Sequence, residues 1–566
     1  MEPVRAFLHA SPIFCLFLAI FLGNLIGRVH VKGVGFGAVV GTLIAGMAVG
    51  IVAHPELPDM LRWVFFYLFL FAIGYSVGPQ FFGSLKKAAL PQIMLAVIVA
   101  VSGLITVVAV AIAFDFDEGT AVGILSGGMT QSAALGTGLS AIAELPIDEA
   151  AKATLTANAP LADAITYGFG DLGLILFLTW LGPLLLRADL RKEARELEAS
   201  LAAASPGGQI ASWASYGVRA YRVDNPALAG LTVSAFEQRF STSRLSVQRV
   251  ERGKDAIKLA PELTLQTDDR IVVSAQRHAF VDADQQIGAE VDDARLLSIP
   301  TLTASVVVTN RAVHGHTLGE LGLDPTTRGV YLASIQRGTV QLPRELWTVV
   351  ERGDILRVVG APDDVERVAR HAGFMERDLS RTDLAFVGAA ICLGMLLGLA
   401  KLDVSGIALG LGTAGSILVV GLVAGWARSR YPVFGAVPEP AQRLLMDIGL
   451  IVFIGMVGMH AGPHAVDAYH QSGGAFFARI FAAGAIVTVV PLAVGALGAR
   501  FLFKMSPLMT LGGLAGAQTC TPGLNALREA TGSNVGTLAY TVPYAIGNIL
   551  LTVWGPVVVA IIHALR

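Results

Sequence analysis

Apolar residues are concentrated in two blocks of the chain, and a more polar stretch separates them. A helix needs about 20 apolar residues to cross a bilayer. In the first block such runs lie near residues 11–28, 34–53, 63–85, 90–114 and 157–186, and in the second near 383–400, 407–427, 441–465, 475–503 and 536–563. Residues 187–380 contain no run of this kind. The pattern predicts a polytopic α-helical membrane protein that carries a soluble insert.

Short polar, glycine-rich motifs interrupt the apolar blocks at matching places. Residues 127–135 read Gly-Gly-Met-Thr-Gln-Ser-Ala-Ala-Leu, and residues 516–524 read Gly-Ala-Gln-Thr-Cys-Thr-Pro-Gly-Leu. Two more pairs follow in the same order, namely 74–80 with 458–464 and 167–171 with 544–548. Three matched pairs in one order indicate an internal duplication. Broken helices at matching positions of two halves point to the substrate site of a transporter.

Composition agrees with a membrane protein. The 566 residues are 54% hydrophobic and 15% charged, whereas a soluble domain has about 25% charged residues. The three cysteines lie far apart in apolar segments, so we expect neither a disulfide framework nor a metal site. The first apolar run is followed by Arg28 and Lys32 and not by a small-residue cleavage site. We therefore expect a retained membrane helix there and not a signal peptide.

Charges in the loops predict how the helices are oriented. Lys and Arg mark the cytoplasmic side. They follow the first, third and last helices of the first block (Arg28, Lys32, Lys86, Lys87, Arg187, Arg191 and Lys192), whereas Asp and Glu dominate the other loops. Basic and acidic loops alternate along the first block only if residues 117–145 enter and leave the membrane on the same face. These residues would then form a re-entrant hairpin. The alternative is that 117–145 and 506–534 are ordinary spanning helices, since glycine and threonine also occur in packed membrane helices.

The predicted fold follows from this orientation. Two inverted repeats, 1–186 and 383–566, would each contain five transmembrane helices plus one re-entrant hairpin. The hairpins would approach from opposite faces and meet near the midplane. The insert would be cytoplasmic, and both termini would lie on the outer side.

The insert itself contains a second duplication. Gly-Leu-Thr-Val at 230–233 matches Gly-His-Thr-Leu at 315–318, and an Asp followed by a Val-rich strand occurs at 269–275 and 354–360. The order strand, helix, strand, strand resembles the RCK-C (TrkA-C) regulatory domain. We predict α+β copies at 208–290 and 295–375, after a helical linker at 187–207. The resemblance implies either sensing of a small regulatory ligand or pairing of two chains, and the residues do not choose between them.

A helix broken inside the membrane offers free N–H groups and a partial positive charge, which suit a carboxylate. Pro522 would fix the start of the second half-helix. The alternative is that the hydroxyls satisfy only the backbone of the hairpins. The predicted substrate-binding residues are Gly128, Thr130, Gln131, Ser132, Ala517, Thr519, Cys520, Thr521 and Pro522.

A second group of residues is predicted to take part in coupling or gating. Ionisable side chains within membrane spans are functional candidates by default. Asp171 is matched by Asn548 in the repeat, so the shared architecture does not require its charge. Arg479 could instead reach the interface, and His460 could be pH-sensitive or structural. The full set is Asp163, Tyr167, Asp171, His460, Arg479, Tyr544 and Asn548.

Residues 120–142 and 506–530, together with the tandem RCK-C insert, resemble the aspartate:alanine exchanger family. The resemblance implies a homodimeric antiporter in a bacterial inner membrane, without cofactor or nucleic-acid partner. Such an exchanger moves a dicarboxylic amino acid or dicarboxylate against a smaller product, with aspartate for alanine as the expected pair. One-for-one exchange of that pair moves net charge. Elevator-type motion is expected by analogy of architecture alone.

Two other classes of function are weighed against this one. The first class is a protein regulated through its RCK-C domains, either an ion channel or a transporter of ions or of a succinate-like dicarboxylate. A channel of this class would be expected to carry a Thr-Val-Gly-Tyr-Gly filter, which the sequence lacks. The second is a membrane-bound enzyme, and the spans carry no nucleophile–base pair or metal constellation that favours it.

Overall fold

The computed structural model describes residues 7–28, 30–31, 34–35, 37–84, 89–204, 216–240, 245–253, 255–276, 280, 286–298, 301–337, 340–376, 382–400, 402–404, 407–409, 412–430 and 435–566. The chain divides into two compact units. Met1–Glu196 and Ser380–Arg566 form the first, and Leu197–Leu379 form the second. The lysines at 32, 86 and 87 and the predicted junction at 207–208 lie outside the described residues.

The first block of the helical unit begins with long apolar helices and ends with a charged one. Its elements are α2 (Pro12–Gly27), the short strands β1 (His30–Val31) and β2 (Val34–Gly35), α3 (Gly37–Ala53), α4 (Asp59–Ser84), α5 (Leu90–Phe114), α6 (Glu118–Gly128), α7 (Ser132–Ala143), α8 (Glu149–Leu176), the π-turn η2 (Phe177–Leu181), α9 (Gly182–Leu186) and α10 (Leu190–Ala204). The charged α10 corresponds to the predicted helical linker.

The second block repeats this order. Its elements are α16 (Leu384–Gly398), β12 (Leu402–Val404), β13 (Ile407–Leu409), α17 (Gly412–Arg430), α18 (Glu439–Phe501), α19 (Pro507–Ala517), α20 (Thr521–Thr531), the 3-10 helix η6 (Val535–Ala539) and α21 (Thr541–Leu565). Gly473, at φ 66°, breaks α18. The two predicted spans at 441–465 and 475–503 therefore lie on either side of that kink.

Six helical segments of the described chain are long and apolar enough to cross a membrane. They are Asp59–Pro79, Leu90–Phe114, Glu149–Leu186, Glu439–Asp467, Gly473–Phe501 and Thr541–Leu565. The predicted spans near 11–28, 34–53 and 383–400 correspond to the shorter apolar helices α2, α3 and α16. The structure thus has a polytopic helical unit, and the number of crossings in each repeat stays a prediction.

Three predicted boundaries were wrong. The span placed at 157–186 begins earlier, at Glu149, because the Asp148 carboxylate accepts a hydrogen bond from Ala151 N at 2.7 Å and caps the helix. The span placed at 407–427 begins only at Gly412, since Ile407–Leu409 pairs with Leu402–Val404 as an antiparallel strand. The span placed at 536–563 starts with the 3-10 turn η6, so its α-helix begins at Thr541.

Both polar motifs break a helix in two. The first separates α6 from α7, and the second separates α19 from α20. Each half has 11 or 12 residues, which is too short to cross a bilayer alone. This confirms that the two motifs interrupt their helices, whereas the membrane face from which each hairpin enters stays a prediction.

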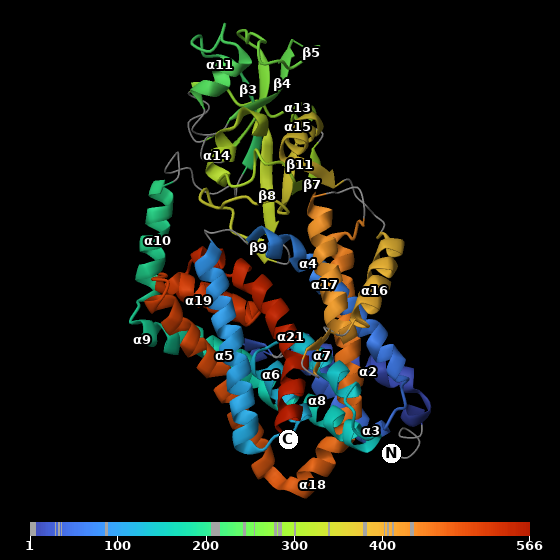
Figure 1. Ribbon diagram of the computed structural model, residues 1–566. Helices are drawn as coiled ribbons and strands as arrows, with labels where there is room; N and C mark the ends of the chain where they lie inside the picture. The colour runs from blue at the N-terminus through green and yellow to red at the C-terminus, as the bar shows by residue number, and fades with distance from the viewer. Residues whose placement is uncertain are drawn as a thin grey trace. The chain divides into compact units, whose positions relative to one another are not determined.

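Glycines let the hairpins pack directly against the backbone of their neighbours. A Cβ on Gly123 of α6 would lie 2.1 Å from Ala159 O of α8, and a Cβ on Gly512 of α19 would lie 2.1 Å from Gly536 O of η6. Figure 1 shows α6, α7, α8 and α21 together in the middle of the helical unit, where α21 contacts both α6 and α7. The first hairpin is thus enclosed by helices of both blocks.

The second unit consists of two sheets of the same topology. The first has the order β3-β6-β4-β5 and the second β11-β7-β10-β8-β9, so the first, fourth, second and third strands of each copy are neighbours. The elements are β3 (Tyr216–Arg222), α11 (Val233–Arg239), β4 (Ser246–Arg252), β5 (Asp255–Ile257), β6 (Arg270–Gln276), α13 (Ala294–Leu297), β7 (Leu302–Val308), α14 (Leu318–Leu323), η5 (Pro325–Thr327), β8 (Val330–Arg337), β9 (Val340–Leu342), β10 (Ile355–Gly360), α15 (Pro362–Ala372) and β11 (Gly373–Glu376).

The two copies share their internal polar contacts. Arg252 binds the Asp269 carboxylate at 2.8 Å in the first copy, and Arg337 binds Asp354 at 2.7 Å in the second. Each copy has its own apolar core. The side chain of Arg328 in the second copy donates to Glu237 of the first at 2.6 Å. Together with the hydrogen bond between Tyr331 of the second copy and Ser274 of the first, this ion pair links the two copies.

Candidate functional site

The two hairpin turns have the same backbone conformation. Thr130 has φ 53° and Thr519 has φ 55°, a left-handed conformation that costs a residue with a Cβ roughly 1–2 kcal/mol. Gln131 N donates to Ser126 O at 2.8 Å, and Cys520 N donates to Ala515 O at 3.0 Å. The sequence motifs therefore correspond to one turn geometry built twice, and a strained threonine lies at the centre of each.

The two turns are bonded to each other. The Thr130 hydroxyl donates to the carbonyl oxygen of Gln518 at 2.6 Å. The Gln518 side chain in turn donates to Thr488 O at 3.3 Å, and the Thr488 hydroxyl donates to Gly128 O at 2.8 Å. All four residues are buried. This closed set of hydrogen bonds, which we call the turn junction, joins the two repeats through Gly128, Thr130, Thr488 and Gln518.

A second contact between the repeats lies beside the turn junction. Gln131 Nε2 donates to Asn548 Oδ1 of α21 at 3.3 Å, and Asn548 Nδ2 donates to Tyr544 O at 3.0 Å. Tyr544 stacks on Tyr540, with ring centroids 5.2 Å apart. The predicted residues Gln131, Tyr544 and Asn548 are thus brought together.

On the other side, the second turn contacts α8. The Cys520 thiol donates to Asp171 Oδ1 at 3.4 Å and accepts from Gly523 N at 3.3 Å. The hydroxyls of Thr521 and Tyr540 share a hydrogen bond of 3.1 Å. The structure therefore places Asp171, Cys520 and Thr521 next to one another, whereas sequence matching had paired Asp171 with Asn548 only by position in the repeat.

The start of each second half-helix provides the conditions for anion binding. The first N–H groups of a helix have no partners within it, and Gln131 does not cap α7 with its side chain. Ser132 begins α7 and is 6% exposed. Thr521 and Pro522 begin α20 and are exposed, while Ala517 and Cys520 just before them are buried. The two starts both carry a hydroxyl, but they differ in access and in capping, because the Cys520 thiol accepts a hydrogen bond from Gly523 N in α20.

Two of the other predicted residues, His460 and Arg479, lie apart from the turns. His460 bonds the carbonyl oxygen of Met456 on its own helix at 2.8 Å, and Arg479 is exposed. No contact given by the described residues joins either one to the turn junction. Tyr167, by contrast, lies beside the first turn: its hydroxyl interacts with the Ser132 side chain, and a Cβ on Gly127 would lie 2.8 Å from Tyr167 N. Asp163 is fully buried on α8.

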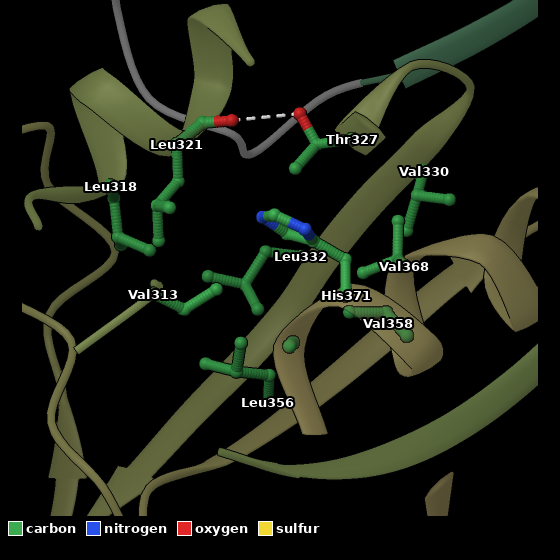
Figure 2. Close-up of a pocket in the computed structure, with 11 residues that line it drawn as sticks. Val313, Leu318, Leu321, Thr327, Val330, Leu332, Leu356, Val358, Val368 and His371 are labelled. Atoms are coloured by element: carbon green, nitrogen blue, oxygen red, sulfur yellow. Dashed lines mark hydrogen bonds between the residues drawn. The ribbon is translucent and has the colours of Figure 1, made fainter. Parts of the chain in front are cut away.

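Two cavities differ in size and chemistry. One of about 470 Å³ is lined by Asn525, Arg528, Glu529, Gly532, Ser533 and Asn534, at the end of α20. The other lies in the second sheet copy of the insert and has a volume of about 50 Å³. Figure 2 shows its apolar lining, with the ring of His371 pointing into the middle and Thr327 at the edge, where Thr327 donates to Leu321 O at 2.8 Å. Ligand pockets usually measure about 300–1,000 Å³, so this second cavity is a packing gap.

Sequence reasoning missed three residues of the site. Thr488 and Gln518 complete the turn junction, and Tyr540 bonds Thr521. Thr488 is a single polar residue in an apolar span, a signal that could have found it. Among the described residues, no group of three His, Cys, Asp or Glu side chains could hold a metal ion.

A polytopic helical unit with paired broken helices, joined to a sheet-rich insert, defines the class of membrane transporters with a regulatory domain. Comparison with known proteins identifies the family. The family model described as "Predicted Permease Membrane Region" of the Asp-Al_Ex (aspartate:alanine exchanger) type matches residues 15–183 and 386–560, and the TrkA-C domain model matches 302–373. The chain therefore belongs to this family of multi-pass membrane transporters.

Relatives along the whole chain are also described as transporters. An uncharacterized transporter of Bordetella bronchiseptica is 48% identical over 568 residues, which cover 100% of this chain and 99% of the relative. Uncharacterized transporters of Bradyrhizobium diazoefficiens and Shewanella oneidensis are 37% and 34% identical over 99% of this chain, and cover 99% and 100% of their own lengths. No solved structure matches the chain.

Proposed function

We propose that this protein is a secondary antiporter that exchanges a dicarboxylic amino acid or dicarboxylate, with aspartate as the expected substrate, for a smaller product such as alanine. The observation that carries the proposal is the 2.6 Å hydrogen bond from Thr130 to Gln518 O. It holds the two matching helix breaks together. We propose that the N-terminal ends of α7 and α20 therefore face a common substrate site. Broken helices arranged in this way form substrate sites in transporters.

The chemistry of the half-helix starts favours a carboxylate. The partial positive charge at a helix N-terminus stabilises an anion, and neither turn motif contains Lys, Arg or His. Ser132 and Thr521 add hydroxyl groups at the two starts. Two such starts suit a substrate with two carboxylates better than one with a single carboxylate.

Access to the site is expected from the side of the second hairpin in this conformation. Thr521 and Pro522 are exposed, while Thr130, Gln131 and Ser132 are 7%, 5% and 6% exposed. The cavity of about 470 Å³ at the end of α20 carries Arg528. We propose that this cavity is a vestibule in which Arg528 attracts carboxylates before they reach Thr521.

The location and assembly of the protein complete the proposal. The loop charges favour a bacterial inner membrane protein with the insert in the cytoplasm and both termini in the periplasm. Exchange of aspartate for alanine would be electrogenic. We propose that the chain forms a homodimer and that the RCK-C insert regulates transport by binding a small ligand or by pairing with its counterpart.

Counterflow in proteoliposomes tests the proposal. The purified full-length protein would be reconstituted into proteoliposomes that contain alanine, aspartate, glutamate or succinate. Uptake of labelled aspartate or succinate into these vesicles would then be measured. Thr130→Ala and Thr519→Ala are expected to lower the rate or affinity of exchange, because Thr130 loses its bond to Gln518 O and Thr519 forms the matching turn. Thr154→Ala is the control, since Thr154 bonds only Ala150 O on the exposed part of α8. Absence of exchange with every carboxylate contradicts the proposal.

A further inference from the structure

Asp163 is a carboxyl group that neither the turn junction nor the half-helix starts use. It lies on α8 with an exposed fraction of 0%, and neither of its carboxylate oxygens has a hydrogen-bond partner among the described residues. The hydroxyls of Ser126 and Tyr167 both lie close enough to interact with it, and the Ser126 hydroxyl donates to Gln131 O at 3.2 Å. Neither hydroxyl forms a hydrogen bond to a carboxylate oxygen of Asp163 in this conformation.

The second repeat shows that the fold does not need an acid here. Tyr167 matches Tyr544, so the residue four positions earlier, Asp163, matches Tyr540. A Cβ on Gly127 would lie 2.8 Å from Asp163 O, and a Cβ on Gly516 would lie 2.2 Å from Tyr540 O. The two positions thus pack against equivalent glycines. In one repeat the side chain is neutral and bonded to Thr521, whereas in the other it is an unpartnered carboxyl.

Among the described residues, no basic side chain forms an ion pair with this carboxyl. The helices that pack on α8 include α3, α6, α7, α18 and α20. After its break at Gly473, α18 packs on α8 through Gly484. On α8, α6, α20 with its cap, and this part of α18, the titratable residues other than Asp163 are Glu118, Glu149, Lys152, Tyr167, Asp171, Arg479, Arg500, Cys520, Arg528 and Glu529. Of the basic ones, Lys152 pairs with Glu149, Arg500 bonds Leu186 O, Arg528 bonds Asn534, and Arg479 is exposed. None of these four forms an ion pair with Asp163.

An ionised carboxylate buried without a partner carries a large desolvation cost, which its neutral acid avoids. We propose that Asp163 is a proton-binding site of the transport cycle. The carboxylate takes up one proton from water when the first hairpin opens away from α8, the neutral acid is buried in the conformation described here, and the proton leaves when the group meets water on the other side. Movement of the substrate is thereby coupled to movement of a proton.

The inference rests on the proposed carboxylate exchange, and the experiment separates the two. Counterflow of labelled aspartate or succinate at equal pH on both sides tests exchange alone. A proton gradient is then imposed on proteoliposomes whose membrane potential is clamped by potassium and valinomycin. For one proton per turnover, accumulation is expected to change by about tenfold per pH unit. A pH-sensitive dye inside the vesicles should report proton movement when aspartate or succinate is added.

Asp163→Asn is the decisive variant, since the amide mimics the neutral acid but cannot release a proton. In this variant, the ratio of gradient-driven accumulation to counterflow is expected to be about tenfold lower than in the wild type for each pH unit imposed. It should equal the ratio found without a gradient. Asp163→Ala replaces it if the Asn variant does not fold. Asp148→Asn is the matched control, because Asp148 is an exposed aspartate at the start of the same helix and an amide oxygen can still accept the capping hydrogen bond from Ala151 N. Three results would each overturn the inference. The wild type could show counterflow that the proton gradient does not affect. The effect of the gradient could persist in Asp163→Asn, or sodium could drive accumulation at constant pH.

Discussion

The close packing of the hairpins predicts a sharp difference between glycines of the same region. Gly123→Ala would place a methyl group 2.1 Å from Ala159 O and 2.7 Å from Ala162 Cβ. Because a carbon and a carbonyl oxygen normally approach to about 3.3 Å, α6 and α8 must separate by roughly 1 Å. Overpacking of this kind costs about 1–3 kcal/mol, of which at most about 1 kcal/mol is recovered from the better helix propensity of alanine.

The second repeat and α8 supply the comparison variants. Gly512→Ala places its methyl group 2.1 Å from Gly536 O and should behave like Gly123→Ala. Gly168→Ala, on α8 itself, meets nothing within 4 Å, so it should keep or slightly raise stability.

Thermal unfolding in detergent and counterflow with aspartate or succinate measure the effect. Both tight variants are expected to unfold at lower temperature than Gly168→Ala. A displacement of about 1 Å in a positioned site can cost roughly a hundredfold in rate, so exchange should fall by about tenfold or more. If Gly123→Ala and Gly512→Ala unfold and exchange as Gly168→Ala does, the packing argument is refuted.

Three further predictions concern the contacts around the site and in the insert. Asn548→Ala removes the acceptor of Gln131 Nε2, which should raise KM for aspartate about fivefold, as expected for a hydrogen bond of about 1 kcal/mol; an unchanged KM in counterflow argues against a role in binding. Arg528→Gln should raise KM more at low than at high ionic strength, because salt screens an exposed charge, and an effect independent of salt would exclude electrostatic attraction. Asp354→Asn removes the closer of the two carboxylates that pair with Arg337, whose side chain is 15% exposed, and leaves only Glu351 at 3.5 Å. The insert of the full-length protein should therefore become several-fold more sensitive to limited proteolysis. Asp269→Asn, whose arginine is 35% exposed, should have the smaller effect, and equal sensitivity would contradict the reasoning.

The sequence predicted the helical breaks because their signal is local. Glycine, threonine and proline at 127–135 and 516–524 are unusual inside apolar runs, and the structure breaks α6 from α7 and α19 from α20 there. The tandem sheets of the insert were predictable for the same reason, since the Thr232 and Thr317 caps and the Asp269 and Asp354 strands recur in order.

The partners of the site residues could not be predicted in the same way. Thr130 and Gln518 are far apart in the chain, and the sequence shows only that each lies near a break. The hydrogen bond between them depends on how the two hairpins dock. Asp163 illustrates the same limit, because the sequence shows an acid in a span but does not show that the facing Ser126 hydroxyl is engaged with Gln131 O.

The unequal exposure of the two half-helix starts has a consequence for the rest of the transport cycle. The repeats are built alike, yet Ser132 is buried where Thr521 is exposed. A duplicated molecule can reach its opposite conformation by letting each half adopt the arrangement that its counterpart now has. The shape of the second repeat is then a template for the first repeat in the alternate state, and that state should expose Ser132 while it hides Thr521. A cysteine placed at each of these two positions should therefore be labelled by a water-soluble thiol reagent in alternation, and never both at once.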